Sequence, residues 1–181
     1  MNQPFFEPWI GERYGVESQF GCRLLLLGES HYGIPDEYEP RFTKRMVQEL
    51  GIDEQTHKFF NGVYTATTGH PAREATVEDR SRFWHGVAFA NFIQEFPSDS
   101  WRVRPTTAQW RMARNVLPAL VEQMRPDFIV VLGLGVRYWL PDQLSVPWVA
   151  TKHPSARGFS GAKVFLDVQA ALSAFRDKPL R

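Results

Sequence analysis

Residues 23–33, with the sequence RLLLLGESHYG, constrain the fold more than any other stretch of the chain. Four consecutive leucines that end at a glycine and a run of polar residues are typical of a strand buried on both faces, as in a parallel sheet. In open α/β sheets, ligands bind in the crevice beyond the carboxyl ends of the strands. We therefore expect the functional residues where other strands end beside Gly28.

The rest of the chain alternates between helical and strand patterns. Strands are predicted at 87–90, 128–132 and 146–150, and helices at 42–50, 53–60, 106–124 and 164–175, with a loop at 61–76 and an irregular N-terminal arm at 1–22. Pro147 cannot donate a backbone hydrogen bond, which favours an edge position for the last strand. The alternation predicts a single α/β domain over 1–181, a three-layer α/β/α sandwich with a central, mainly parallel four-stranded sheet.

Composition and charge restrict the classes of function. The 181 residues carry a formal net charge of +1 and one cysteine, Cys22. One cysteine excludes an internal disulfide or a multi-cysteine metal site within one chain, so we expect no metal and no cofactor. No apolar run approaches membrane-spanning length, and the N-terminus lacks the pattern of a signal peptide, so we expect a cytoplasmic protein without a membrane partner.

Local charge is more informative than the total. One group of arginines comprises Arg102, Arg104, Arg111 and Arg114, and a second basic group comprises Lys152, Arg157 and Lys163. Each group is either a solvated surface or a site for phosphate contacts.

Polar side chains follow the predicted strands at their carboxyl ends. Glu29, Ser30, His31 and Tyr32 follow the first strand, Asn91 the second, and His153 the last. Right-handed crossovers bring these strand ends to one rim of the sheet, so we expect the side chains to converge. The glycines of Gly133-Leu134-Gly135 follow the third strand, and we interpret them as close strand-to-helix packing because the rest of a dinucleotide motif is missing.

Five segments, taken in order, resemble one known family. They are residues 28–32, Asn91, 104–107, 125–133 and 153–155. The set resembles the motifs of the uracil-DNA glycosylase superfamily, and its middle segments resemble the thermostable iron–sulfur branch. The resemblance covers residues 23 to about 175, with an atypical insertion at 34–82 that we expect over the site. It implies a DNA glycosylase that acts, as a monomer, on single- or double-stranded DNA containing a damaged base.

The resemblance also implies roles for individual residues. Glu29 would orient water or stabilise the sugar cation, and His153 would donate a hydrogen bond to the departing base. Asn91 would read the base edge. Tyr32 would close the base pocket, which Ser30 and His31 would also line.

Further roles concern base stacking and the DNA strand. Phe60, with Phe59 and Tyr64 as alternatives, would stack on the flipped base. Ser155 would hold a phosphate with Lys152 beside it, and Arg157 would enter the gap that the flipped base leaves.

The sequence departs from the family pattern at three points. Ser30 stands where the uracil-specific branch has an aspartate, His31 replaces the usual proline, and the cluster-binding cysteines are missing. The missing cysteines exclude an iron–sulfur cluster, and the serine leaves catalysis to Glu29 alone.

Other interpretations of the same residues remain open. Glu29 could cap a helix or pair with an arginine, His153 could fix a turn, and Asn91 could be a turn residue. The chain could therefore be a binding protein for DNA or nucleotides that lacks catalysis. It could also be a hydrolase of free modified nucleosides or nucleotides, if the 34–82 segment closes the groove where DNA would lie.

Overall fold

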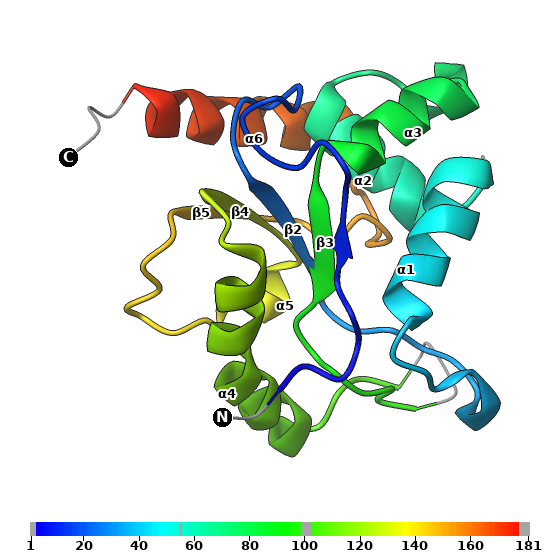
Figure 1. The fold of residues 1–181 in the computed structure, drawn as a ribbon, viewed down its shortest axis with the longest axis vertical. Coiled ribbons are helices and arrows are strands. Elements are labelled where there is room, and N and C mark those ends of the chain that lie inside the picture. Colours follow the sequence, from blue (N-terminus) through cyan, green and yellow to red (C-terminus); the bar gives the residue numbers. More distant parts are fainter. Residues whose placement is uncertain (1–2, 55, 99–102, 178–181) are drawn as a thin grey trace.

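The computed structural model describes residues 3–54, 56–98 and 103–177 and shows an α/β fold around one five-stranded mixed sheet (Figure 1). The strand order is β1-β3-β2-β4-β5. The strands are β1 (Trp9–Ile10), β2 (Leu24–Gly28), β3 (Ala88–Asn91), β4 (Phe128–Leu132) and β5 (Trp148–Thr151). The predicted α/β class and the parallel arrangement of β2 to β5 are confirmed.

The sheet edges differ in how well they were predicted. β5 is an edge strand, as Pro147 indicated, although it begins at Trp148. The opposite edge is β1, which pairs antiparallel with β3, so the prediction of four strands and of an irregular arm over 1–22 was wrong at this point. A strand of two residues is too short to show a period in sequence.

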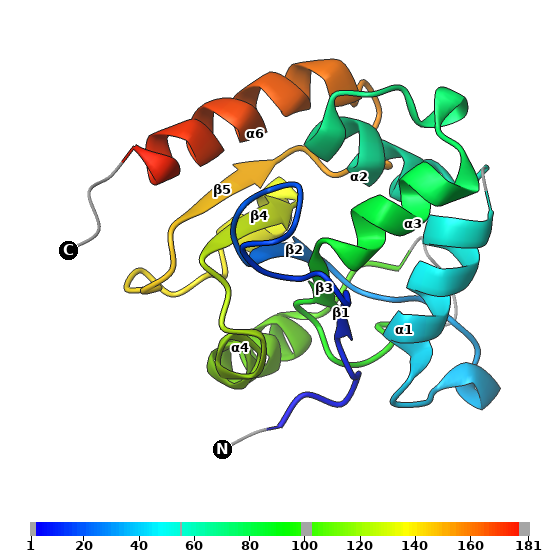
Figure 2. The same cartoon turned by 45° about the horizontal axis from the view of Figure 1, so that its top comes forward.

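Alternate residues of β2 face opposite sides of the sheet, and each side has its own core. Leu24 and Leu26 pack in one buried cluster with α2 (Lys58–Thr68), α3 (Val77–His85) and α6 (Gly161–Arg176). Leu25 and Leu27 pack in the other cluster with α4 (Thr107–Met124). Figure 2 shows α4 on one side of the strands and α2, α3 and α6 on the other.

The helix predicted at 42–50 takes a different form. α1 (Phe42–Met46) continues into η2 (Val47–Asp53), a π-helical segment that contains Gly51. Gly51 lies inside this segment, which continues to Asp53. A Cβ at this residue would lie 2.8 Å from Nε1 of the buried Trp84, and that nitrogen donates a hydrogen bond to the Gly51 carbonyl. The glycine therefore permits close packing of η2 on α3.

The region 53–76 was predicted incorrectly. The helix lies at Lys58–Thr68, where a loop was expected from residue 61, and only η3 (Ala72–Glu74) follows it. Two glycines allow α2 and α6 to approach closely: a Cβ at Gly161 would lie 2.6 Å from Thr65, and one at Gly69 2.8 Å from Phe165. This packing stabilises a helix of low intrinsic propensity.

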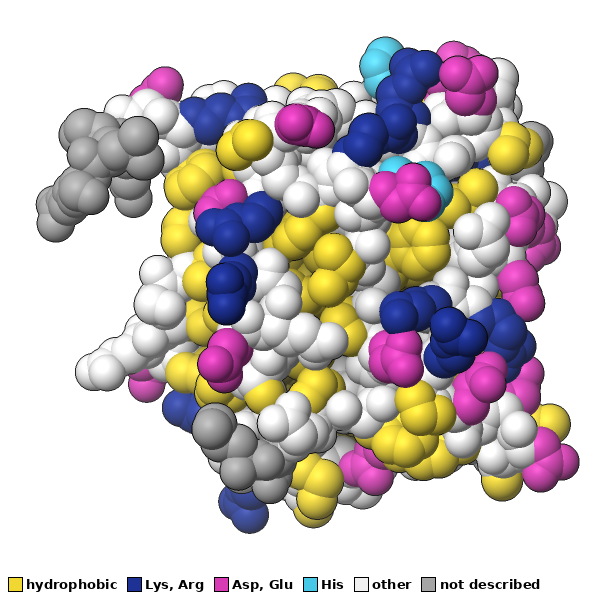
Figure 3. All heavy atoms as spheres, in the orientation of Figure 1, with side chains coloured by type: hydrophobic (Ala, Val, Ile, Leu, Met, Phe, Trp, Pro, Cys, Tyr) yellow, Lys and Arg dark blue, Asp and Glu magenta, His cyan; other side chains and the backbone are white. Residues whose placement is uncertain are grey.

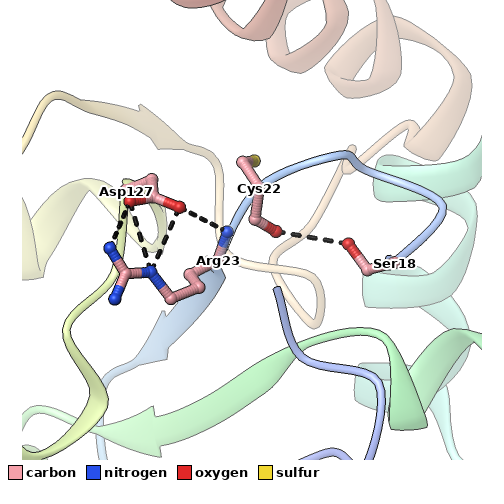
Figure 4. Close-up of polar contacts among 4 residues, drawn as sticks. All are labelled: Ser18, Cys22, Arg23 and Asp127. Atoms are coloured by element: carbon pink, nitrogen blue, oxygen red, sulfur yellow. Dashed lines mark hydrogen bonds and ion pairs between the residues drawn. The ribbon is translucent and has the colours of Figure 1, made fainter. Parts of the chain in front are cut away.

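The amino ends of β2 and β4 are joined by an ion pair between Arg23 and Asp127 (Figure 4). Nη2 of Arg23 lies 2.7 Å from Oδ1 of Asp127, and the backbone N–H of Arg23 donates to Oδ2 at 2.8 Å. Figure 4 also shows the Ser18 hydroxyl donating to the carbonyl of Cys22. These contacts fix the end of the sheet opposite to the predicted site.

The basic side chains of α1 are neutralised by neighbouring acids. Lys44 pairs with Glu7, and Arg45 pairs with Glu39. Dark-blue and magenta side chains accordingly lie side by side over α1 in Figure 3. Among the described residues, no helix is long and apolar enough to cross a membrane.

Candidate active site at the carboxyl ends of the strands

The register of the sheet brings the predicted polar residues to one rim. Gly28 is paired with Asn91, and Leu132 with Thr151, so β2, β3, β4 and β5 end at similar heights. Glu29 follows β2 and His153 follows β5. Backbone hydrogen bonds from Phe92 to the Gly28 carbonyl and from Ile93 to the Glu29 carbonyl continue the pairing past the end of β3. The convergence inferred from sequence is therefore present for these residues.

Glu29 is a buried carboxylate held by one arginine. Nη1 of Arg104 lies 3.2 Å from Oε1 of Glu29, and Nη2 lies 3.3 Å from Oε2. The Glu29 side chain is 8% exposed, whereas the Arg104 side chain is 72% exposed. The guanidinium therefore covers the carboxylate and has further N–H donors available for a ligand.

Two opposing effects set the pKa of Glu29. Burial raises the pKa above its usual value, and the charge of Arg104 lowers it. The net direction is upward, so the carboxylate is held in a site where desolvation disfavours its charge. Gly135, in α5 (Leu134–Arg137), lies beside this pair, since a Cβ there would be 3.4 Å from Oε2 of Glu29 and 3.6 Å from Nη2 of Arg104.

His153 is held as a neutral imidazole with a defined tautomer. The backbone N–H of Ser155 donates to Nδ1 of His153 at 3.1 Å. Nδ1 is therefore the acceptor, and the ring proton is on Nε2. Burial and the nearby charge of Arg104 lower the pKa of His153 to about 4. Near neutral pH, this side chain can donate a hydrogen bond from Nε2 without carrying a charge.

An aromatic ring lies next to His153. The ring of Phe59, from the first turn of α2, has its centroid 5.4 Å from that of His153. Phe59 is half-buried, whereas Phe60 is 4% exposed and Tyr64 5% exposed, and both of these pack in the core. Among the three candidates for a stacking aromatic, the structure therefore places Phe59 at the site and Phe60 against Trp84 in the core. Phe60, the first candidate from sequence, is therefore a core residue in this structure, and of the three rings Phe59 lies beside His153.

Asn91 is buried at the end of β3 and lies directly against β2. A Cβ at Gly28 would come within van der Waals overlap of Oδ1 of Asn91 and 3.3 Å from its Cγ. Gly28 is therefore required to leave space for the Asn91 amide, which is 4% exposed as a residue. The glycine before Glu29 thus has a direct structural role at the rim.

Of the other residues of the first motif, His31 lies away from its predicted place. His31 points into an aromatic cluster, with ring centroids 5.2 Å from Phe6 and 4.9 Å from Phe42, and its Nε2 lies 2.8 Å from Oγ1 of Thr43. It is a packing residue here, not a part of the rim. Tyr32 is half-buried, and the Ser30 hydroxyl is buried without a hydrogen-bond partner among the described residues.

The basic residues after β5 lie in an exposed loop. Lys152, Ser155 and Arg157 are exposed, and the buried Pro154 anchors the loop on α2. A Cβ at Gly62 would lie 2.8 Å from Cβ of Pro154 and 3.2 Å from Phe159, so the absence of a side chain at Gly62 allows this contact. The loop thus presents two cations and a hydroxyl to solvent beside His153.

Arg104 is the residue that sequence analysis did not assign to the site. It precedes Pro105 and the N-cap Thr106, whose hydroxyl accepts a hydrogen bond from the backbone N–H of Gln109 as expected for the start of α4. The segment 104–107 was part of the family resemblance, which was the available signal. Of the same arginine cluster, Arg111 and Arg114 are exposed on α4, and Arg102 lies outside the described residues.

Two further observations bear on ligands. Within residues 3–54, 56–98 and 103–177, no group of three or more His, Cys, Asp or Glu side chains is arranged to hold a metal ion. A groove of about 530 Å³ lies between the N-terminal segment and α4 and is lined in part by Phe5, Tyr38 and Gln109. None of the predicted site residues lines this groove.

The fold and the rim together define an α/β protein with a mixed sheet and a partly buried polar site where its parallel strands end. In comparisons with known proteins, no family model matches the chain and no curated protein matches it.

Proposed function

We propose that this protein is a DNA glycosylase that hydrolyses the N-glycosidic bond of uracil, or of a related deaminated or damaged base, flipped out of DNA. We also propose that its fold is the three-layer sandwich of the uracil-DNA glycosylase type. The protein acts as a monomer in this proposal. The single observation that carries it is the grouping of Glu29, Arg104, His153 and Phe59 at the strand ends. Cleavage of this bond requires a donor for the departing base, a negative group near the sugar, and a ring that holds the flipped base.

His153 supplies the donor in this proposal. Its Nε2–H is fixed by the Ser155 N–H on Nδ1, and the low pKa of about 4 keeps the ring neutral. As the base leaves, negative charge develops on its carbonyl oxygen, and a preorganised hydrogen bond stabilises that charge more in the transition state than in the ground state. The adjacent charge of Arg104 adds to this stabilisation.

Glu29 supplies the negative charge near the sugar. Arg104 contacts both oxygens of Glu29 and favours the charged form of the carboxylate, against the larger effect of burial. The exposed guanidinium can bind a phosphate of the DNA strand. Because Arg104 stays paired with Glu29, the carboxylate keeps its charge in a poorly solvated site, where it stabilises the oxocarbenium-like sugar or orients water.

The remaining residues bind the base and the strand. Phe59 stacks on the flipped base, and Asn91 and Tyr32 contact it from β3 and the first motif. Ser155, Lys152 and Arg157 contact the DNA backbone, and Arg157 enters the gap in the stack. The 34–82 segment supplies Phe59 from α2.

One observation favours a second candidate function. The Glu29–Arg104 ion pair neutralises the only acid of the first motif, which fits a DNA- or nucleotide-binding protein without catalysis. The two candidates differ in base release but share DNA binding. Hydrolysis of a free nucleoside or nucleotide is a third outcome that the same assay detects.

The decisive experiment measures base release from labelled single- and double-stranded oligonucleotides that carry uracil, hypoxanthine or xanthine. We expect release by the parent protein and a loss of at least about 100-fold in Glu29→Gln and His153→Ala, in line with the usual contribution of such groups. Glu17→Gln and His70→Ala are the matched controls, because both residues are exposed and outside the site.

The outcomes separate the candidates. No release from any substrate, with DNA binding retained, contradicts the glycosylase and supports the binding protein. Release from free nucleosides but not from oligonucleotides supports the third candidate. Equal loss in the two control variants would show that the effect is not specific to the site.

A further inference from the structure

We propose that Leu134, Arg137 and Tyr138 form a platform on which an unpaired strand of DNA lies, with Tyr138 stacked on a base that neighbours the flipped nucleotide. These three residues, on and directly after α5, are called the α5 platform below. The inference deepens the proposed function and rests on it, because the strand is part of the same DNA substrate. α5 lies at the lower end of the strands in Figure 1.

The α5 platform exposes apolar side chains directly after a strand that is fully buried. Tyr138 is 82% exposed and Leu134 is 47% exposed, although both follow a fully buried strand by only a few residues. Residues four apart on a helix lie on the same face, so the two side chains are neighbours. Val103, which precedes Arg104, is a third exposed apolar residue, at 48%.

Contacts place this surface beside the candidate active site. Gly135 lies between Leu134 and Tyr138 in sequence, and a Cβ on it would be 3.4 Å from Oε2 of Glu29. A Cβ on Gly133 would be 3.7 Å from Cδ2 of His153. The start of α5 therefore lies against both proposed catalytic residues. A strand whose flipped nucleotide lies between Glu29 and His153 passes over or next to α5.

Charge on and around the α5 platform suits phosphate groups. Arg137 is the only charged residue between Gly133 and Pro141. It is exposed, as are Arg104, Lys152 and Arg157 on the adjoining segments of the rim. Cations along the backbone path together with an exposed ring are the combination with which proteins bind single-stranded nucleic acid.

An unpaired strand fits this surface better than a duplex does. A tyrosine ring stacks only on a base whose face is exposed, and bases within a duplex already stack on one another. A tyrosine that projects from a rim is therefore of use where neighbouring bases are unstacked. The platform thus predicts a preference for single-stranded DNA or for a distorted duplex around the target base.

The test is a binding titration with single-stranded oligonucleotides that carry 2-aminopurine beside an unmodified uracil, using the Glu29→Gln protein to prevent turnover. We expect binding to quench 2-aminopurine fluorescence. In the Tyr138→Ala background the quenching should disappear and affinity should fall about 5- to 100-fold, as is found when one stacking side chain is removed. Tyr138→Phe should retain both within about twofold, because the ring remains.

Control variants show whether the effect belongs to Tyr138 and to the unpaired strand. Val16→Ala removes an exposed apolar side chain, 79% exposed, near the opposite end of the sheet, and should change neither quenching nor affinity. Affinity for fully paired duplex should change less than affinity for the single strand. Circular dichroism of each variant establishes that the fold is retained.

The results distinguish this proposal from the proposed function. Unchanged single-strand affinity in the Tyr138→Ala background, while the parent protein binds and releases base, overturns the platform only. Tyr138-dependent binding without base release overturns the glycosylase and leaves the platform in place. If Tyr138→Ala instead converts a dimer to a monomer in sedimentation, the surface is an interface between copies of this chain and the platform is wrong.

Discussion

Arg104 holds both carboxylate oxygens of Glu29, at 3.2 Å and 3.3 Å, while most of its own side chain faces solvent. The two residues are 75 positions apart in sequence and meet because α4 begins beside the end of β2. Arg104 also contributes to the low pKa of His153. Burial is the larger influence on the pKa of both proposed catalytic groups, and the same exposed cation acts on both as the second influence.

Removing that cation changes the protonation of Glu29. Burial raises the pKa of Glu29 and Arg104 opposes this effect, so Arg104→Ala should raise the pKa further. The carboxyl group then becomes neutral at a higher pH than in the parent protein. We expect the ¹³C NMR titration of Glu29 to move upward and base release near pH 6 to fall about 10-fold or more.

A conservative variant serves as the control for this prediction. Arg104→Lys keeps the positive charge but loses the bidentate geometry, so it should keep most of the effect on the Glu29 pKa and lose part of the activity. An unchanged Glu29 titration in the Arg104→Ala background would contradict the electrostatic role of Arg104.

The burial of His31 leads to a prediction about how the free energy of unfolding depends on pH. Burial among Phe6 and Phe42 lowers its pKa from about 6.5 to about 3. The unfolded chain therefore binds a proton between these pH values that the folded chain does not. By linkage, the free energy of unfolding should fall as the pH decreases from about 6.5 towards 3, by on the order of 3–5 kcal/mol from this residue.

The measurement for His31 is urea unfolding at a series of pH values. His31→Gln keeps a group that can hydrogen-bond to Thr43 but has no charge to gain, so its curve should be flatter over the same range. His70→Gln, at an exposed residue, should follow the parent curve. Identical slopes for the parent and His31→Gln would show that another group dominates the acid sensitivity.

The strands β2 to β5 were predictable because each is a short, largely apolar run that ends in, or is followed by, a glycine or a polar residue. That pattern gave Glu29, Asn91 and His153 at one rim. The start of α4 was also predictable from local sequence, since Thr106 or Thr107 can cap a helix, and the structure shows Thr106 as the N-cap in a capping box with Gln109.

Other features depended on tertiary packing and could not be predicted. The helix α2 contains a glycine and several threonines, which favour a loop by propensity, and its packing on α6 outweighs that preference. The choice between Phe59 and Phe60 depends on the rotation of α2 about its axis, and the predicted helix at 53–60 was too short and misplaced to indicate it. From sequence, Glu29 could pair with an arginine that the pattern did not specify. The fold identifies this arginine as Arg104.

The ion pair between Arg23 and Asp127 leads to a prediction about how much the amino ends of β2 and β4 contribute to stability. Its carboxylate accepts hydrogen bonds from the side chain and the backbone N–H of Arg23, and these contacts lower its pKa below 3.8. The stabilisation is therefore present above about pH 4 and is lost as the pH falls below the lowered pKa. Because the pair is partly exposed and screened, Asp127→Asn should cost only about 1 kcal/mol in urea unfolding.

A more exposed pair provides the comparison. Arg73 and Glu74 are 85% and 62% exposed, so Glu74→Gln should change the free energy of unfolding by less than about 0.5 kcal/mol. If the two variants lose equally little stability, the negative charge of Asp127 contributes no more than that of an exposed ion pair. Base release should be unaffected in both, since neither lies at the rim.

Gly62 of α2 packs against Pro154, the residue that follows His153, so a substitution there should affect the candidate active site. Alanine in the middle of a helix is favoured over glycine by about 1 kcal/mol, but here its Cβ would lie 2.8 Å from Cβ of Pro154. The loop that follows His153 must therefore move, while the helix itself gains stability. We expect Gly62→Ala to change the free energy of unfolding by less than about 1 kcal/mol. Base release should fall about 10-fold or more, because a small displacement of a catalytic group lowers the reaction rate strongly.

The ring nitrogens of His153 report this displacement independently of activity. If the loop moves, the Ser155 N–H no longer holds Nδ1, and the ¹⁵N shifts of the ring should show a mixture of tautomers. Gly161→Ala is the control, because its Cβ would meet Thr65 on the same helix pair without touching Pro154. It should lower stability and leave the His153 tautomer unchanged. A single tautomer in the Gly62→Ala background would mean that the loop position does not depend on this contact.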